Sequence, residues 1–359
     1  MSDINHRNYH TRLEQIQRIT KQHNLQASTI TPVAYQELGP CPYNNFIYKL
    51  ELSEPASSSS FHNPNEPLTP CTTSPPDGTL TYILRMSNPL AMGINPHASR
   101  IENEVAAMSL ARQGLESYGP GLGSLIPKIY TFCSKPSHPD DLPWVLMEYK
   151  SGVPLDEFFS YQSDTIKESI IEQVADILSG LRSCPLPPGI TYGGLGLSTD
   201  GSIIIPNLSD SDTRVLIHGD LTMNNILIDL STCKLTALID FDFACIAHPA
   251  HEFLVSLQDL GGNVMGPYGE DPTEGKLSQA LLSGDFSDDD VPGDLCDVDG
   301  MKVLREWRAL ELLVCPFHLA AEFIVKRMGE EAREGAKRGG QGELVAKMGD
   351  LEEVMGGSC

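Results

Sequence analysis

The sequence predicts an α+β fold of two lobes, with a small antiparallel sheet in the N-terminal lobe and a larger, mainly helical C-terminal lobe. Two short apolar runs, over 46–52 and 81–86, indicate strands that pair across a long connection. Apolar residues at helical spacing predict helices over 163–182 and 301–328. The length of 359 residues suits either one two-lobed domain or two ordinary domains.

The order of these segments predicts the domain boundaries. We expect the N-terminal lobe at 1–147, the C-terminal lobe at 148–328 and a flexible tail at 329–359. A helix over 8–24 would pack outside the small lobe. The connection over 53–79 is rich in Ser and Pro, so we expect it to be a disordered insertion between the two strands.

The most informative stretch contains two polar motifs. They are His-Gly-Asp-Leu-Thr-Met-Asn-Asn at 218–225 and Ile-Asp-Phe-Asp at 239–242, and each follows a β-like apolar run. Phosphoryl transfer from ATP needs a carboxylate at the acceptor hydroxyl, and an amide and a second carboxylate on Mg2+. Asp220, Asn225 and Asp240 would supply these groups in that order. Either motif alone would suit loop residues that cap strands, but both in order favour a catalytic site.

Four further stretches accompany these motifs. They are Asn-Asn-Phe-Ile-Tyr-Lys at 44–49, Tyr-Ile-Leu-Arg at 82–85, Asn-Glu-Val-Ala at 103–106 and His-Pro-Ala-His-Glu at 248–252. With them, the sequence resembles the aminoglycoside phosphotransferase and choline kinase group of small-molecule kinases, most of all its fungal-type members. The resemblance covers roughly residues 35–260. It implies a bilobal protein-kinase-like fold that uses ATP and Mg2+, with Asp220 as the catalytic carboxylate.

The resemblance also implies a group that binds the ATP phosphates. Arg85 ends an apolar strand where kinases place the cation that grips the α and β phosphates, and its planar fork suits phosphate oxygens. Glu104, in a helix predicted over 99–113, would pair with Arg85. Glu102 is the competing candidate, and a solvent-facing Glu104 is the other alternative.

The adenine and the metal ion would be held by other segments. The strand predicted over 143–149 leads into the hinge between the lobes, and backbone amides over 39–45 could cover the phosphates. The residues implied in adenine binding at the hinge are Glu148, Tyr149 and Lys150. Those implied in Mg2+ binding are Asn225, Asp240 and Asp242. For Asp242 an alternative stays open, in which it satisfies a nearby backbone amide.

Composition restricts the partners and the compartment. The formal net charge of −23 argues against a nucleic acid or an anionic membrane as partner, because phosphate binding needs clustered Lys and Arg. The nine cysteines include no C-x-x-C pair, so we expect reduced thiols. No charged segment followed by an apolar stretch begins the sequence, and no apolar run of about 18 residues occurs. We therefore expect a cytoplasmic protein.

The predicted function is ATP-dependent phosphorylation of a hydroxyl on a small-molecule metabolite. The glycine-rich G-x-G-x-x-G loop and the Asp-Phe-Gly and Ala-Pro-Glu motifs of protein kinases are absent. Their absence favours a small-molecule acceptor over a protein, and a protein kinase is the third hypothesis. The second is a catalytically silent kinase fold that serves as a nucleotide-binding or scaffold protein. The sequence does not predict an oligomeric state.

Overall fold

The structure is a computed structural model in two compact units, Met1–Pro249 and Ala250–Cys359. Every helix and strand with the bounds given below lies in the first unit. The described residues are 5–33, 42–56, 60–61, 69–90, 97–186, 196–197, 203–204, 214–247, 251–252, 256, 335 and 338. The predicted helix over 301–328, most of the predicted tail and residues 39–41 of the predicted phosphate loop lie outside the described residues.

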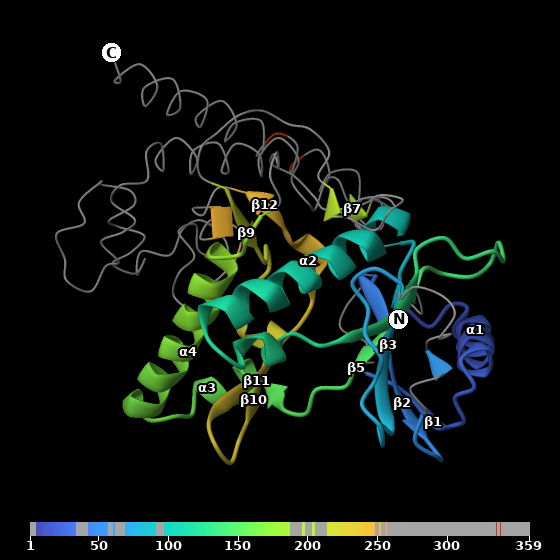
Figure 1. Ribbon diagram of the computed structural model, residues 1–359, viewed down its shortest axis with the longest axis horizontal. Helices are drawn as coiled ribbons and strands as arrows, with labels where there is room; N and C mark the ends of the chain where they lie inside the picture. The colour runs from blue at the N-terminus through green and yellow to red at the C-terminus, as the bar shows by residue number, and fades with distance from the viewer. Residues whose placement is uncertain are drawn as a thin grey trace. The chain divides into compact units, whose positions relative to one another are not determined.

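The N-terminal lobe is built on a five-stranded antiparallel sheet, as predicted (Figure 1). Its strands are β1 (Ala27–Pro32), β2 (Asn45–Leu52), β3 (Thr81–Ser87), β4 (Ile129–Cys133) and β5 (Trp144–Glu148), in the order β1-β2-β3-β5-β4. The predicted pair is β2 and β3, which places Ile47 opposite Arg85. Strands β1 and β4 were not predicted, because each is short and has no clear apolar alternation.

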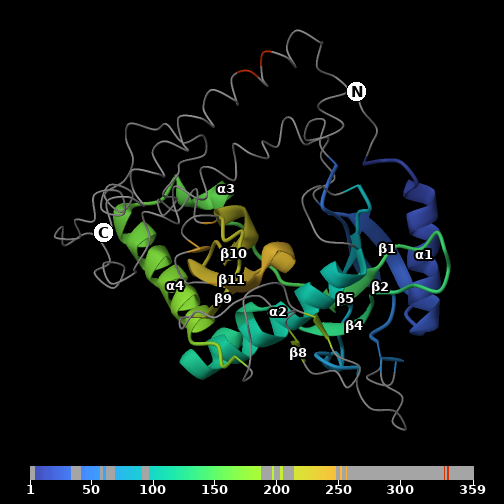
Figure 2. The ribbon, with the colours of Figure 1, turned by 90° about the horizontal axis from the view of Figure 1, so that it is seen from above.

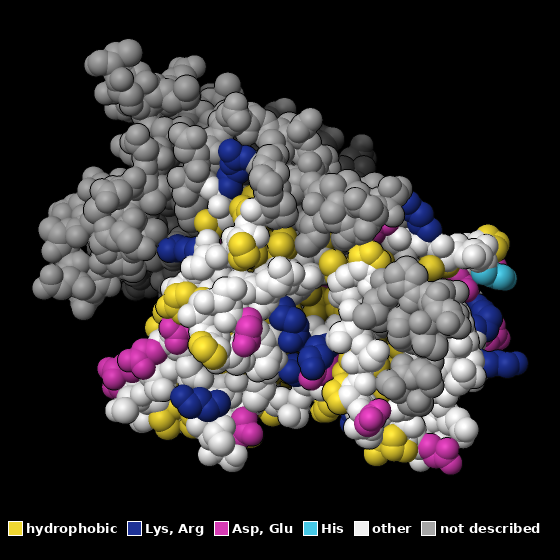
Figure 3. Space-filling view, in the orientation of Figure 1, with side chains coloured by type: hydrophobic (Ala, Val, Ile, Leu, Met, Phe, Trp, Pro, Cys, Tyr) yellow, Lys and Arg dark blue, Asp and Glu magenta, His cyan; other side chains and the backbone are white. Residues whose placement is uncertain are grey.

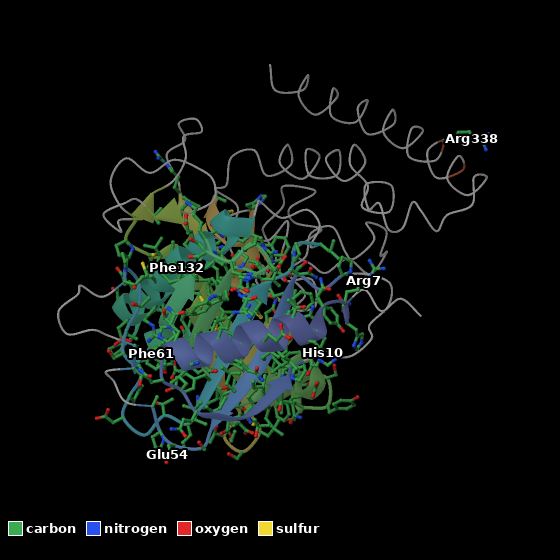
Figure 4. All side chains as sticks on the ribbon, turned by 90° about the vertical axis from the view of Figure 1, so that its right-hand side faces the viewer. Arg7, His10, Glu54, Phe61, Phe132 and Arg338 are labelled. Carbon is green, nitrogen blue, oxygen red and sulfur yellow. The ribbon has the colours of Figure 1, made fainter. Side chains whose placement is uncertain are left out.

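Helix α1 (Tyr9–Gln22) covers one face of this sheet. Its buried residues Ile16 and Ile19 pack in one core cluster with Tyr48, Tyr82 and Leu84 of the central strands. Figure 4 shows α1 crossing the sheet, with Phe61 near one end of the helix and His10 near the other. The predicted helix over 8–24 is therefore confirmed, and its apolar side faces the sheet.

The predicted insertion over 53–79 is only partly described, and the described part makes specific contacts. The ring of Phe61 stacks on His23 with centroids 5.4 Å apart, and on Tyr82 at 5.8 Å. The backbone N–H of Thr73 donates to the carbonyl of Ile129 at 2.9 Å. The described residues of this stretch are therefore stabilised locally by a partly buried aromatic ring and a backbone hydrogen bond.

Helix α2 (His97–Tyr118) runs from the sheet to α4 (Asp164–Arg182) and is followed by the 3-10 helix η2 (Leu122–Leu125). Figure 2 shows the sheet on one side of α2, with α3 and α4 on the other. A Cβ atom on Gly114 would lie 2.8 Å from the carbonyl oxygen of Gly180. The two helices therefore cross at glycines, because a side chain there would separate their backbones.

Helix α4 confirms the predicted helix over 163–182, with Ser163 at its N-cap. Its buried residues include Ile170, Val174 and Ile177, but Ile171 is 40% exposed. Not every apolar residue of this helix is therefore buried. Ile171 lies one residue, or about 100°, from Ile170, so it falls outside the stripe that a single helix can bury against its neighbours.

The described part of the C-terminal lobe adds short strands around the predicted catalytic motifs. Its elements are β6 (Val153–Pro154), α3 (Asp156–Phe159), β7 (Gly196–Leu197), β8 (Ile203–Ile204), β9 (Val215–Ile217), η3 (Met223–Asn225), β10 (Ile226–Asp229), β11 (Lys234–Leu238), η4 (Phe241–Phe243) and β12 (Cys245–Ala247). The sheets β11-β10-β6, β12-β9 and β7-β8 are all antiparallel. None of the described helices combines the length and the apolar character needed to cross a bilayer.

Candidate active site

His218 ties the two catalytic motifs together. It follows β9 directly and its side chain is completely buried. The backbone N–H of Asp220 donates to its Nδ1 at 3.3 Å, and its Nε2 lies 3.0 Å from the carbonyl oxygen of Ile239. With Nδ1 as acceptor, Nε2 is the protonated nitrogen and donates to Ile239. The ring also packs against Phe241, with centroids 4.6 Å apart. His218 therefore fixes the loop of 218–225 beside the turn of 239–242.

Asp220 and Asn225 face each other across this loop. The amide Nδ2 of Asn225 donates to Asp220 Oδ2 at 3.0 Å and to the Asp220 carbonyl at 2.8 Å. The backbone of Asn225 is held in turn, since its carbonyl accepts from the N–H of Ile239 at 2.9 Å. These bonds occupy the amide nitrogen and leave the amide oxygen, Oδ1, as the atom available to a ligand.

Gly219, between His218 and Asp220, requires a glycine for two reasons. Its φ of +78° lies in the left-handed region. A Cβ atom there would lie 2.9 Å from the carbonyl carbon of Phe243, and closer still to the oxygen. The loop therefore approaches the backbone of η4 too closely for any other residue.

We expect Gly219→Ala to lower the free energy of unfolding by roughly 2–4 kcal/mol, because it adds a backbone clash to an unfavourable φ. Urea denaturation would measure the change. Gly121→Ala is the matched control, since Gly121 has a φ of +87° but nothing within 4 Å of its added Cβ. An equal loss of unfolding free energy in the two variants would show that the close approach of Gly219 to Phe243 does not contribute to the cost.

Asp240 stands at the end of β11 in a left-handed conformation, with φ +67° and ψ +65°. Asp tolerates this region better than most residues do. Its side chain is 31% exposed, and its Oδ1 accepts from Arg85 Nη2 at 2.7 Å. The turn therefore presents a carboxylate that is only partly buried, next to a guanidinium group.

Arg85 and Glu104 form a buried ion pair between β3 and α2. Arg85 Nη1 donates to Glu104 Oε1, and the two side chains are only 4% and 1% exposed. Glu102, the competing candidate, instead accepts a hydrogen bond from Ser134 Oγ at 2.8 Å. The structure therefore brings Glu104, and not Glu102, to Arg85.

The charge state of Glu104 depends on this crowded setting. Burial, together with the carboxylates of Asp242 and Asp240, raises the pKa of Glu104 to about 7, although Arg85 opposes the shift. The ordinary pKa of a glutamate is 4.5. Between these two values the folded protein holds a proton that the unfolded chain has lost, so stability falls as the pH rises through this range.

A substitution can test this titration. Gln mimics the protonated form of Glu104, so Glu104→Gln should not titrate at this position. We expect the free energy of unfolding of the parent to fall relative to that of Glu104→Gln as the pH rises from about 5 to about 8. Chemical denaturation across that range would measure the difference. Parallel pH profiles for the two proteins would mean that Glu104 is ionised throughout.

Asp242 is almost fully enclosed, with a side chain 2% exposed. Its Oδ2 lies 2.8 Å from Arg85 Nη2, accepts from Arg100 Nη2 at 2.9 Å and accepts from Asn45 Nδ2 at 2.7 Å. Burial opposes its ionisation, but Arg85 and Arg100 outweigh that effect and lower its pKa. The partners of Asp242 are thus two guanidinium groups and a side-chain amide.

The predicted hinge follows β5. The N–H of Glu148 donates to the carbonyl of Lys128 at 2.8 Å, and the Glu148 carboxylate accepts from the N–H of Lys128 at 3.0 Å. Lys150 Nζ forms an ion pair with Glu148 at 3.2 Å. Tyr149 is 39% exposed, and Lys49 Nζ lies 5.0 Å from the centre of its ring. The side chain and N–H of Glu148 therefore stabilise the hinge, and Tyr149 leaves a ring surface exposed.

Three residues around the site were missed in the sequence analysis. Arg100 and Asn45 contact Asp242, and Asn103 Nδ2 donates to the carbonyl of Ala244 at 2.9 Å. Asn45 and Asn103 stand in the stretches that carry the family resemblance, but no local pattern assigned a role to their side chains. The position of Arg100, four residues before Glu104, could have indicated that it lies near the site, because residues i and i+4 share a helix face.

The donor set fits Mg2+. Hard cations prefer oxygen ligands, and Mg2+ is commonly held by one or two protein oxygens together with phosphates and water. The partly exposed carboxylate of Asp240 and the amide oxygen of Asn225 are of this kind. Among the described residues, no group of three or more His, Cys, Asp or Glu side chains could enclose a metal ion by itself. Two protein oxygens of this kind would leave coordination positions of Mg2+ for phosphates and water.

Comparisons with solved structures return aminoglycoside phosphotransferases. A thermostable mutant of APH(4)-Ia in its apo form is 13% identical, with 95% of this chain and 99% of that chain covered and a TM-score of 0.40. APH(2")-IIa in a streptomycin–ATP ternary complex is 12% identical, with 93% and 95% covered and a TM-score of 0.46. APH(2")-IIa with gentamicin is 14% identical, with 94% and 95% covered and a TM-score of 0.43.

None of the curated proteins compared with the chain matches it. A family model does match, over residues 203–278, and its description is "Phosphotransferase enzyme family". This segment contains the loop of 218–225 and the turn of 239–242. The part of the chain that assembles Asp220, Asn225 and Asp240 therefore matches the phosphotransferase enzyme family, in agreement with the resemblance seen in the sequence.

Proposed function

We propose that this protein is an ATP-dependent phosphotransferase that transfers the γ-phosphate to a hydroxyl group of a small molecule. The observation that carries the proposal is the meeting of two groups of residues. Asp220 and Asn225 lie 3.0 Å apart on one loop, and Asp240 joins the Arg85–Glu104 ion pair through a 2.7 Å bond. Phosphoryl transfer relies on this combination of a proton acceptor, oxygen ligands for Mg2+ and a fixed cation.

In the proposed reaction, the acceptor oxygen attacks the γ-phosphorus, the bond from that phosphorus to the β–γ bridging oxygen breaks, and ADP leaves. Asp220 orients the acceptor hydroxyl and takes its proton. Its position is maintained by the amide of Asn225 and, through the backbone, by His218. The chain thus contributes positioning and charge more than covalent chemistry.

Arg85 is proposed to grip the α and β phosphates, and Glu104 keeps its guanidinium group in place. The Nε of Arg85 is buried without a partner in the described part of the chain. Asn225 and Asp240 would hold Mg2+, which would offset the negative charge of the phosphates. Backbone groups at Glu148, Tyr149 and Lys150 are proposed to form hydrogen bonds with the adenine. The N–H of Glu148 is not one of these groups, because it donates to the carbonyl of Lys128.

A small molecule is the proposed acceptor class. The neighbouring structures include complexes with hygromycin B, gentamicin and streptomycin, which are described for those proteins. On the face shown in Figure 3, the Lys and Arg side chains of the described residues form no extended patch. The group near the centre is small and has acidic side chains beside it. That distribution, together with the net charge of −23, supports an acceptor other than nucleic acid. A cytoplasmic location stays a prediction.

The test is to incubate the protein with γ-labelled ATP and Mg2+ and with either the small-molecule or the protein fraction of a cell extract. We expect label to appear in a small-molecule product and to disappear with Asp220→Asn. Label only in proteins would favour a protein kinase instead. Binding of ATP without transfer to any acceptor would favour the silent, nucleotide-binding alternative.

A further inference from the structure

We propose that Asp242 is not a Mg2+ ligand but the centre of a buried polar cluster, with Arg100 and Asn45, that positions Arg85 for the nucleotide. The nucleotide part of this inference rests on the proposed function. Counted over the whole residue, Asn45, Arg100 and Asp242 are 9%, 3% and 7% exposed. They come from the start of β2, from the first turns of α2 and from η4. They are called the interlobe cluster below.

Arg100 is the most connected member of the interlobe cluster. Its Nη2 donates to Asp242 Oδ2 at 2.9 Å, to the Asn44 carbonyl at 3.0 Å and to Asn45 Oδ1 at 3.2 Å. Its Nη1 donates to the Asn88 carbonyl at 3.3 Å. One side chain of α2 thus bonds the backbone beside both strands at one end of the β2–β3 pair, where Asn45 lies opposite Ser87, and also bonds the carboxylate of Asp242. The guanidinium group therefore connects α2 to this end of the sheet and to η4.

The charges of the site explain why a second arginine is needed. Glu104, Asp240 and Asp242 all contact Arg85. A single guanidinium group cannot neutralise three carboxylates, and an unpaired buried carboxylate is costly. Arg100 supplies the second positive charge to Asp242. Asp242 therefore does not depend on Arg85 alone for its positive partner.

The connections form a closed ring. Arg100 and Glu104 are four residues apart and so share one face of α2. Glu104 binds Arg85, Arg85 binds Asp240, and Asp240 is two residues from Asp242, which returns to Arg100. Because each of these contacts is short, we expect a substitution of Asp242 or Arg100 to displace both α2 and the Arg85 side chain. Asn45 adds a further link, to the strand paired with that of Arg85.

The deciding measurement is the Kd of the full-length protein for ATP, by calorimetry, at limiting and at saturating Mg2+. We expect Asp242→Asn and Arg100→Gln each to raise the Kd about tenfold at both Mg2+ concentrations, since each loses a charged hydrogen bond that positions Arg85. Asp240→Asn is the reference for a lost metal ligand, and its defect should be largest at limiting Mg2+. Recovery of the parent Kd by Asp242→Asn at saturating Mg2+ would overturn the proposal, as would an unchanged Kd in Arg100→Gln.

Two controls separate positioning from general loss of structure. Arg12→Gln removes another buried arginine, which donates to Tyr48 and to the Asn5 carbonyl, both at 2.9 Å. It should lower the Tm without changing the Kd for ATP. Glu102→Gln changes a neighbouring carboxylate of α2 that contacts Ser134, and it too should leave the Kd unchanged. A tenfold rise in the Kd for ATP of either control would mean that the Kd responds to any loss of stability. That result would overturn the proposal.

The cluster can also be tested without nucleotide. In a double-mutant cycle of Asp242→Asn and Arg100→Gln, the Tm loss of the double variant should be smaller than the sum of the two single losses, because both remove one interaction. Additive losses would overturn the cluster. If the parent binds no ATP, the proposed function and the positioning role fail together, whereas this cycle still decides whether the cluster exists. If these variants do not fold, Asn45→Ala removes the two hydrogen bonds of the Asn45 side chain to Asp242 and Arg100 without removing a charge, and an unchanged Kd there would overturn the proposal.

Discussion

Asp220→Asn is expected to lower kcat by about 10²–10⁴, the range for a lost proton acceptor. The Kd for Mg-ATP should stay close to that of the parent, because Asp220 faces Asn225 and is assigned to the acceptor, whereas Arg85 and Asp240 are proposed to hold the phosphates and the metal ion. Asn keeps the size of the side chain, so the loop and the His218 bonds should survive. Steady-state kinetics with the acceptor found by the transfer assay would measure kcat, and calorimetry would measure the Kd.

Asp176→Asn is the matched control for this change, because Asp176 is an exposed aspartate of α4 far along the chain from the site. It should leave both constants unchanged. A fall in kcat below about tenfold for Asp220→Asn would mean that another group accepts the proton. Circular dichroism of the variant would show whether a larger fall reflects lost structure instead of lost chemistry.

Asp240→Ala should remove most of the stabilisation that Mg-ATP gives to the protein. At a ligand concentration of about 100 times its Kd, binding stabilises a fold by about 2.7 kcal/mol, and thermal unfolding detects such a shift readily. The variant loses both a proposed Mg2+ ligand and a partner of Arg85, so the shift should shrink toward zero. The scan without nucleotide provides the baseline for each protein.

Comparison of the two aspartate variants tests whether their roles are separate. Asp220→Asn should retain the thermal shift with Mg-ATP, and Asp240→Ala should lose it. An equal loss in both would contradict the assignment of Asp220 to the acceptor and Asp240 to the metal. A full shift in Asp240→Ala would remove Asp240 from the nucleotide site, and absence of a shift in the parent would contradict ATP binding altogether.

Local patterns predicted the central elements of the fold well. The strands β2, β3, β5, β9 and β11 and the helices α1, α2 and α4 all lie where apolar spacing indicated, apart from differences at their ends. Each is long or apolar enough for its own residues to indicate burial. Strands β1 and β4 escaped prediction because their burial is completed by neighbours in the sheet, which a local window does not contain.

The insertion over 53–79 also makes contacts that its local sequence does not indicate. Its composition predicted disorder, yet Phe61 packs against His23 and Tyr82. A single aromatic ring in a polar stretch has no periodicity to reveal it. The Phe61 ring packs against the core cluster of α1 and the sheet, and that cluster forms only when these elements come together.

The sequence by itself determined which chemical groups the site contains and the order in which the chain supplies them. Asp220 and Asn225 are five residues apart, so one short loop is sufficient to bring them together. Only the tertiary structure decided that Arg85 is bound by Glu104 and not by the competing Glu102. It also decided that Asp242 binds Arg100 and Asn45, which lie 142 and 197 residues away in the chain. Contacts across such separations depend on how whole elements pack and on which charges that packing buries, and no local spacing encodes either.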